Sequence, residues 1–290
     1  MITREFREER GNFERGILVM EQHAHVPEVE VRHVRRAYTD GGKSVLALDD
    51  ISFHINEHEF VCIIGPSGCG KSTLLRLLAG LEFPTSGSVN LGGRPVNGPN
   101  PKNAAMIFQT FGLLPWRSVY QNIELGLQAI NVPEPKRHEI ITKYVKLMDL
   151  EEFSDSYPAE LSGGMRQRVG IARALAVEPK VLLMDEPFSM LDAQTAESLR
   201  RDVLEIWNNK QMKTNTFVMV THLIEESVFM ADRIIVLSKR PGRLVADVPV
   251  DVPRPRWEHA RDPEFFEMCD MLKRLIAYHG GPELAQLGKA

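Results

Sequence analysis

Alternating apolar and polar residues near the start of the chain predict a small antiparallel sheet. An extended segment from residue 29 to about Tyr38 places three valines on one side and charged residues on the other: Val29, Val31 and Val34 against Glu30, Arg32 and Arg35. This alternation is typical of a strand with one solvated face. After a turn at Thr39–Lys43, two further strands are expected at Val45–Leu48 and Ile51–Ile55.

Continuous apolar runs further along predict the buried strands of a parallel sheet. The runs are Phe60–Ile64, Ala104–Phe108, Val181–Met184 and Phe217–Val220. Helical patterns lie between them, at Leu74–Gly80 with its capping glycine and around Ser198–Trp207. This alternation is typical of an α/β fold with helices on both faces of the sheet. From about residue 110 to 165 the pattern is mostly helical, which predicts an α-helical subdomain inserted into the α/β core.

The last third of the pattern predicts a hairpin and a terminal helix. Apolar runs at Ile234–Leu237 and Leu244–Ala246 flank Arg240–Arg243, where proline followed by glycine suits a type II turn. The basic residues there fit a solvated turn or a nucleic-acid patch. The segment Asp262–Glu264 has the chemistry of a helix start, and a core-facing stripe follows: Phe266, Cys269, Leu272 and Ile276. A partner-facing role for this helix is the alternative. We therefore expect a loosely ordered leader at 1–27, the main unit at 28–253 and a helical extension at 254–290.

Composition narrows the function classes. Charged residues make up 26% of the chain and hydrophobic ones 43%, as in ordinary globular proteins. A formal net charge of −4 gives no electrostatic reason to expect nucleic acid as a partner. The three cysteines lack metal-ligand spacing and fit a reducing compartment. No apolar run approaches the roughly 18 residues of a membrane span, so a cytoplasmic protein is expected.

A phosphate-binding loop follows the first apolar run. It fits G-x-x-x-x-G-K-[ST] and consists of Gly65, Pro66, Ser67, Gly68, Cys69, Gly70, Lys71, Ser72 and Thr73. Glycines allow successive N–H groups to point inward, and the helix start adds its positive dipole end. Lys71 would reach the β- and γ-phosphates of a nucleotide, and the Ser72 hydroxyl would hold Mg²⁺. A glycine-rich turn without a ligand would explain neither side chain.

Polar residues that follow the other apolar runs supply candidate catalytic groups. Asp185 would bind the magnesium, and Glu186 would accept a proton from the attacking water or orient it. An exposed strand end is the alternative for this pair. Gln109 could ligate the metal or hold the water, or be a satisfied loop amide. His222 could contact the γ-phosphate, or cap the helix that begins near Ile224.

A second anion site is predicted at Leu161–Arg168. Ser162 is a good N-cap, and Gly163 and Gly164 leave the N–H groups of the first helical turn accessible. An ordinary capped helix is the plainer interpretation of Ser-Gly-Gly alone.

With these motifs in this order, the chain resembles the ABC-type ATPases from about Val29 to Val252. The resemblance implies a P-loop NTPase (RecA-like) core with an N-terminal antiparallel β subdomain and an inserted helical subdomain. It identifies a glutamine loop at Gln109, a signature at Leu161–Arg168, a D-loop at Ser189–Asp192 and a switch histidine at His222. Tyr38 falls where family members stack an aromatic ring on adenine. His58 stands where the family usually has glycine.

The resemblance also implies cofactors and partners. ATP and Mg²⁺ would bind in a head-to-tail dimer, most simply a homodimer, in which Ser162, Gly163, Gly164 and Asp192 of one subunit face the ATP of the other. Phe111–Trp116, Asn122 and Ser238–Arg243 look like the ATPases of nitrate, sulfonate and taurine importers, and the tail from Arg254 adds to this likeness. A separate transmembrane permease would then be the direct partner, with a solute-binding protein acting indirectly and the subunit lying on the inner face of the membrane. The alternatives are an ABC ATPase acting on ribosomes or DNA, and a P-loop kinase or nucleotide switch.

One hypothesis concerns Cys69 by itself. A thiol near Lys71 and a helix N-terminus is expected to have a lowered pKa and some reactivity. A buried and inert small residue is the alternative.

Overall fold

The computed structural model describes residues 26–277. Its centre is a six-stranded sheet in the order β10-β9-β3-β8-β7-β6. Five strands are parallel: β3 (Phe60–Ile64), β6 (Ala104–Ile107), β7 (Val181–Asp185), β8 (Thr216–Val220) and β9 (Arg233–Leu237). The sixth, β10 (Leu244–Pro249), pairs antiparallel with β9 and completes the expected hairpin. The predicted parallel sheet is confirmed.

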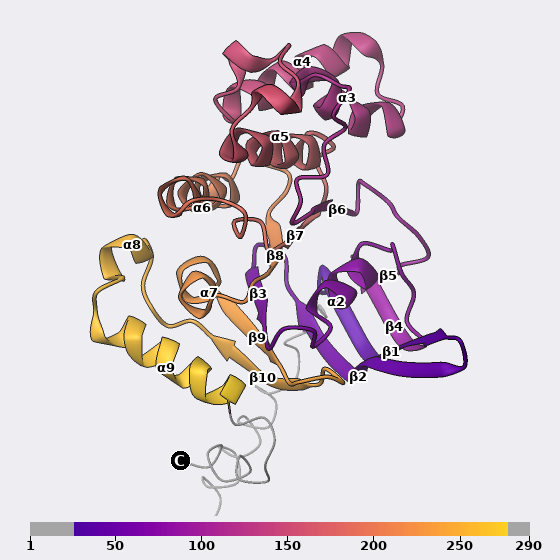
Figure 1. Cartoon of the computed structure of the whole chain (residues 1–290), viewed down its shortest axis with the longest axis vertical. Helices are drawn as coiled ribbons and strands as arrows, with labels where there is room; N and C mark the ends of the chain where they lie inside the picture. Colours follow the sequence, from indigo (N-terminus) through magenta and orange to yellow (C-terminus); the bar gives the residue numbers. More distant parts are fainter. Residues whose placement is uncertain (1–25, 278–290) are drawn as a thin grey trace, which may run out of the picture.

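A four-stranded antiparallel sheet lies beside the first, in the order β2-β1-β4-β5 (Figure 1). Its strands are β1 (Val29–Asp40), β2 (Lys43–Ile55), β4 (Ser86–Leu91) and β5 (Arg94–Pro95). The two strands expected at 45–48 and 51–55 are one strand, β2, and the prediction of a break was wrong. Asp50 has φ +54, and the pairing register of β1 and β2 shifts beside it. This irregularity interrupts the alternation of apolar and polar side chains but does not end the strand.

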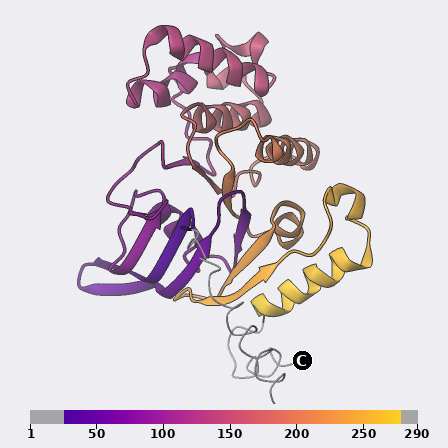
Figure 2. The same cartoon turned by 180° about the vertical axis from the view of Figure 1, so that it is seen from behind.

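The helices fall into three groups (Figures 1 and 2). The first lies above the sheets in Figure 1 and contains α3 (Val119–Ala129), α4 (Glu134–Leu147) and α5 (Gly163–Ala176), with short 3₁₀ turns at Glu151–Phe153 and Pro158–Glu160. The second follows the parallel strands and contains α2 (Lys71–Leu78), α6 (Ala193–Asn208) and α7 (Ile224–Met230). The third is C-terminal and contains α8 (Arg256–His259) and α9 (Pro263–Ala277).

Two hydrophobic clusters meet across the central sheet. Along β3, Phe60, Cys62 and Ile64 belong to a cluster shared with the helices, whereas Val61 and Ile63 belong to one shared with α2 and the antiparallel sheet. Because successive side chains of a strand point to opposite faces, this division requires β3 to be apolar throughout. The buried strand holds the phosphate loop that follows it.

Three local predictions differ from the structure. The run at 104–108 was expected to be buried throughout, but β6 is an edge strand, and Phe108 beyond it is 39% exposed. The stripe of α9 begins at Phe265, which is buried with Cys269 and Leu272, whereas Phe266 is exposed. Gly242 does not have the positive φ of a type II turn, so that prediction was wrong.

Close approach explains the glycine at position 242. A Cβ built there would lie 2.2 Å from the Cys69 carbonyl oxygen, and the Gly242 amide donates to the Ala47 carbonyl oxygen at 2.8 Å. His58, by contrast, takes the left-handed conformation that glycine would favour, with φ +67. Among residues 26–277, no helix is both long and apolar enough for a bilayer. Most of the predicted leader lies outside the described residues.

Candidate active site

The phosphate loop joins the buried end of β3 to the start of α2. Gly70 is the N-cap with φ +105 and provides no side-chain cap, so the first N–H groups of α2 are left to a ligand. A Cβ at Gly70 would lie 2.6 Å from Leu48 Cδ2, which also restricts the position to glycine. The buried Lys71 amine donates to the carbonyl oxygens of Gly65 at 2.8 Å and Pro66 at 3.2 Å, and thus lies across the loop.

The predicted metal position joins α2 to the end of β7. Ser72 Oγ donates to Asp185 Oδ1 at 3.0 Å. Burial raises the pKa of Asp185, and the bond from Ser72 and the nearby positive charges oppose this shift. A hydroxyl and one carboxylate suit Mg²⁺, which takes few protein ligands and completes its shell with phosphate oxygens and water. Within the described residues, no cluster of three His, Cys, Asp or Glu side chains could hold a metal alone.

Glu186 lies at the centre of the predicted catalytic residues. Its Oε2 accepts from His222 Nδ1 at 3.0 Å and from Gln109 Nε2 at 3.3 Å. Because a carboxylate only accepts, the first contact requires the proton on Nδ1. The Gln109 amide thus faces Glu186 and also Ser189 Oγ, at 3.4 Å, and it makes no hydrogen bond to Ser72 or Asp185.

The backbone of Glu186 is unusual for its residue type. Its φ is +46, a conformation that costs energy in any residue but glycine and that often occurs at functional sites. Three hydrogen bonds hold it there. The Glu186 amide donates to the Val220 carbonyl oxygen at 3.0 Å, and the Glu186 carbonyl oxygen accepts from Ser189 Oγ at 2.9 Å and from the Ser189 amide at 3.2 Å. The position of the Glu186 carboxylate is therefore set by hydrogen bonds to β8 and to the loop that contains Ser189.

Tyr38 lies at the end of β1 beside the phosphate loop. Its hydroxyl donates to Glu82 Oε2 at 2.5 Å and lies 3.2 Å from Thr73 Oγ1. The Arg36 guanidinium lies over the ring, 4.5 Å from its centroid, and the residue is 36% exposed. No sequence pattern pointed to Glu82, which follows neither an apolar strand nor a recognisable motif.

The predicted signature begins α5. Ser162 Oγ accepts from the Met165 amide at 3.2 Å, which confirms the N-cap. A Cβ on Gly163 would lie 3.6 Å from Leu191 Cδ2, so the signature adjoins the D-loop of the same chain. Asp192 caps α6 by accepting from the Thr195 amide at 3.0 Å, and bonds from Thr195 lower its pKa.

The structure does not bring all of these residues into one site. The signature lies with the upper helices, whereas α2 and the phosphate loop lie between the two sheets in both views (Figures 1 and 2). One group contains Lys71, Ser72, Asp185, Glu186, Gln109 and His222, and Tyr38 adjoins it through Thr73. Ser162, Gly163, Gly164 and Asp192 form a second group.

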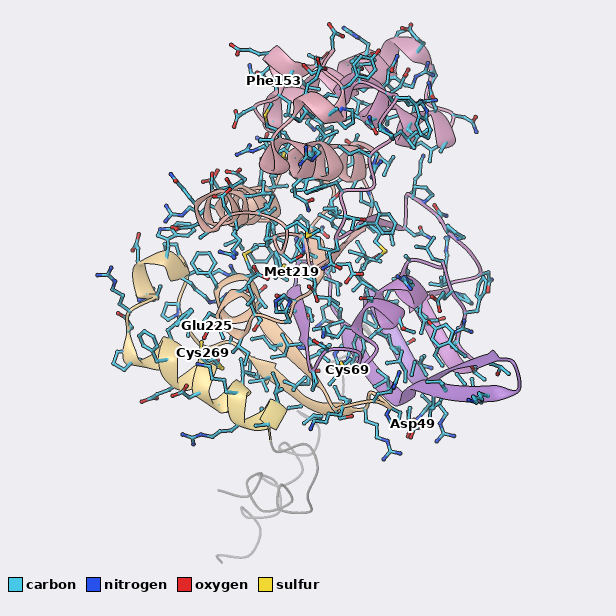
Figure 3. The ribbon with its side chains drawn as sticks, viewed as in Figure 1. Asp49, Cys69, Phe153, Met219, Glu225 and Cys269 are labelled. Carbon is cyan, nitrogen blue, oxygen red and sulfur yellow. The ribbon has the colours of Figure 1, made fainter. Side chains whose placement is uncertain are left out.

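The prediction of a lowered Cys69 pKa was wrong. Cys69 is only 1% exposed, and it lies near the hairpin loop that follows β9 (Figure 3), where its carbonyl oxygen faces Gly242. Burial raises the pKa of its thiol, and the opposing effects of the Lys71 charge and of backbone hydrogen bonds are smaller. The motif revealed the lysine and the helix start but not the hydrophobic cluster in which Cys69 is buried.

Comparison with known proteins decides the family. The ABC transporter family pattern matches residues 48–189. The nitrate import ATP-binding protein NrtD of Synechocystis sp. is 44% identical over 255 residues, 86% of this chain and 94% of that protein. The chain belongs to the ABC transporter ATP-binding proteins. The uncharacterized ABC transporter ATP-binding protein MJ0412 of Methanocaldococcus jannaschii is 45% identical over 229 residues, 79% of this chain and 84% of that protein.

A more distant relative and a solved structure agree with this family. The bicarbonate transport ATP-binding protein CmpD of Synechococcus elongatus is 37% identical, over 84% of this chain and 88% of that protein. The dimeric post-hydrolysis state of the ATP-binding cassette MJ0796 bound to ADP and Pi has a TM-score of 0.68 and 32% identity, over 77% of this chain and 98% of that chain. As an ABC ATPase, this protein binds and hydrolyses ATP, and Mg²⁺ is the usual partner ion in the family.

Proposed function

We propose that this ABC ATPase powers an importer for a small anion or organic solute of the nitrate, sulfonate or taurine type. The similarity to proteins named for nitrate import and bicarbonate transport supports the import of a small anion. The segments Phe111–Trp116 and Ser238–Arg243 support the same subfamily. The subunit would lie on the inner face of the cell membrane, bound to a separate permease.

The glutamine loop offers a surface for the permease. Trp116 is 70% exposed, and the loop before it is anchored to α5, because Arg173 donates to the carbonyl oxygens of Gly112 at 2.7 Å and Phe111 at 3.2 Å. A permease helix that contacts this apolar loop would be connected through it to Gln109. A solute-binding protein would act only through the permease.

The position of Glu186 carries the catalytic part of the proposal. Its carboxylate would accept a proton from the attacking water, while His222 contacts the γ-phosphate and Gln109 holds the water. Lys71 and the glycine-rich backbone would hold the β- and γ-phosphates, and Tyr38 the adenine. Mg²⁺, held by Ser72 and Asp185 with Gln109 as a further ligand, would neutralise charge on the phosphates.

A second copy of the chain would complete the site. The signature lies apart from the phosphate loop, so Ser162, Gly163, Gly164 and Asp192 would face the ATP held by the partner in a head-to-tail homodimer. ATP binding would close the dimer and hydrolysis would open it, which moves the attached permease. The dimeric arrangement of the MJ0796 cassette supports this proposal.

Glu186→Gln tests the catalytic assignment. The amide keeps the size of the side chain but is a poor base, so hydrolysis should fall by about 10²- to 10⁴-fold while ATP binding is retained. Phosphate release and ATP titration would be measured on the purified protein. Glu152→Gln, on the helical region away from the site, is the control for loss of a carboxylate. Undiminished turnover in Glu186→Gln would rule out the base.

A separate experiment tests import. Detergent extracts of native membranes are expected to yield the ATPase bound to an integral permease, and the adjacent genes should encode a permease and a solute-binding protein. A deletion strain should fail to take up one of nitrate, sulfonate or taurine. Co-purification with ribosomes or DNA would instead favour the non-transport class of ABC ATPases.

A further inference from the structure

A carboxylate outside the recognised motifs touches the residue that would hold the base of ATP. Glu82 accepts from the Tyr38 hydroxyl at 2.5 Å. The same carboxylate contacts Arg36 Nε at 3.3 Å and Arg76 Nη1 at 3.6 Å. The Glu82 side chain is 18% exposed, so these contacts are partly shielded from water.

Glu82 is fixed by the helix that carries the phosphate loop. The amides of Leu81 and Glu82 donate to the Arg76 carbonyl oxygen on α2, at 2.9 and 3.2 Å. The following segment is bound to β1, since Arg36 Nη1 donates to the Phe83 carbonyl oxygen at 3.0 Å and the Ala37 amide donates to Thr85 Oγ1 at 3.0 Å. The carboxylate therefore bridges the strand that presents Tyr38 and the helix that presents Lys71.

The hydrogen bonds around Tyr38 have a defined direction. The phenol has one proton, which it donates in the hydrogen bond to Glu82. The phenolic oxygen can therefore only accept a hydrogen bond from Thr73 Oγ1, 3.2 Å away. Thr73 is the last residue of the phosphate loop. The two hydrogen bonds, from Thr73 to Tyr38 and from Tyr38 to Glu82, hold the tyrosine ring at a set position relative to the phosphate loop. Arg36 covers one face of the ring, so a base would stack on the other.

We propose that Glu82 is a positioning residue for the nucleotide base: it holds the Tyr38 ring against the phosphate loop, so that stacking on adenine and binding of the phosphates occur together. This inference rests on the proposed role of Tyr38. It predicts a contribution to ATP affinity that depends on the base and leaves the chemistry at Glu186 unchanged.

A double-mutant cycle tests this inference. Tyr38→Phe keeps the ring and loses the hydroxyl, and Glu82→Ala removes the acceptor. Each change should weaken ATP binding by about 3- to 10-fold, the range for one hydrogen bond of ordinary net strength. The double variant should bind ATP no more weakly than the single variant with the lower affinity, because both changes break the same hydrogen bond. Binding would be measured by calorimetry on the full chain without Mg²⁺.

Three controls separate positioning from a structural effect. Inorganic tripolyphosphate lacks the base, so its affinity should be the same in every variant. Glu82→Gln keeps an acceptor and should restore part of the ATP affinity lost in Glu82→Ala. Arg76→Ala removes another partner of Glu82 without touching Tyr38, and it should leave ATP affinity unchanged.

The outcomes distinguish this inference from the proposed function. If Tyr38→Ala weakens ATP binding and Glu82→Ala does not, the inference is wrong and the role of Tyr38 stands. If Glu82→Ala weakens the binding of tripolyphosphate as much as the binding of ATP, Glu82 acts on the phosphate loop and the inference is also wrong. If Tyr38→Ala has no effect, both the base platform and the inference fail. None of these results affects the assignment of Glu186, which its own variant tests.

Discussion

At the scale of single residues, burial outweighs neighbouring charge around the phosphate loop. Cys69 lies beside Lys71 and a helix start, both of which favour a thiolate, yet burial raises its pKa. At Asp185 burial is again the largest effect: it raises the pKa of the carboxyl, although the Ser72 hydrogen bond lowers it. Both side chains thus favour the neutral form more strongly than their exposed counterparts do.

The Cys69 thiol should accordingly be unreactive. At pH 8, iodoacetamide should modify it more slowly than it modifies glutathione, since a raised pKa leaves less thiolate and the sulfur is covered. The rate should keep rising as the pH is raised above 8, because the thiol titrates above its ordinary range. Peptide mass spectrometry would follow each cysteine, with urea-unfolded protein as the control for access. Modification of Cys69 in the folded protein as fast as glutathione would contradict the assigned burial.

Much of the candidate site could be predicted residue by residue, for a topological reason. Gln109, Asp185 and His222 each follow a short apolar run, and the carboxyl ends of parallel strands share one edge of a sheet. Glu82 had no such signal, because it is brought to Tyr38 by the turn after α2 and by pairing of distant segments.

At the scale of elements, the hairpin loop after β9 supports the phosphate loop. Its Gly242 carbonyl oxygen accepts from the Asp49 amide at 2.9 Å, and Arg243 Nε donates to Asp49 Oδ2 at 2.9 Å. The sequence predicted a hairpin but assigned the glycine to a type II turn. Local pattern reveals turn residues, whereas the contact with Cys69 that requires glycine depends on tertiary packing.

Gly242→Ala should therefore weaken ATP binding. The added methyl would lie 2.2 Å from the Cys69 carbonyl oxygen, so either the hairpin or the phosphate loop must move. We expect the ATP Kd to rise by at least about tenfold, the effect of losing about 1.4 kcal/mol or more of binding free energy. Gly170→Ala is the matched control, since its methyl would meet only the Phe111 carbonyl oxygen at an ordinary 3.5 Å. Equal ATP affinity in the two variants would contradict the supporting role of the loop.

The boundaries of strands and the buried faces of helices also depend on tertiary contacts that local sequence pattern does not reveal. Asp49 and Asp50 interrupt the alternating pattern within β2, and the pattern alone predicts a break between two strands there. In the structure Asp50 adopts a positive φ and Asp49 is buried against Arg35 and Arg243, so tertiary partners keep the strand continuous. In α9 the stripe that faces the core is set by packing against α7, which selects Phe265 and leaves Phe266 outside.

At the scale of the whole molecule, the proposed dimer requires each site to be built from two chains. The phosphate loop and Glu186 would come from one chain, and the Ser162–Gly164 signature from the other. Turnover per subunit should then fall when the protein is diluted below its dimerisation range, and ATP binding should fall much less. A constant specific activity at all concentrations, with monomers shown by light scattering, would contradict the composite site.

Complementation between two inactive variants gives the sharpest test of this arrangement. Lys71→Ala disables the phosphate loop, and Gly163→Asp places a negative charge where the γ-phosphate of the partner would lie; each homodimer should be inactive. In a mixed dimer, the phosphate loop of the Gly163→Asp chain meets the signature of the Lys71→Ala chain, which restores one intact site. An equal mixture should recover up to about a quarter of wild-type turnover, because half of randomly formed dimers are mixed and each has one of two sites intact. Phosphate release would measure the recovery. If both loops of a site came from the same chain, neither variant could supply what the other lacks and the mixture would stay inactive.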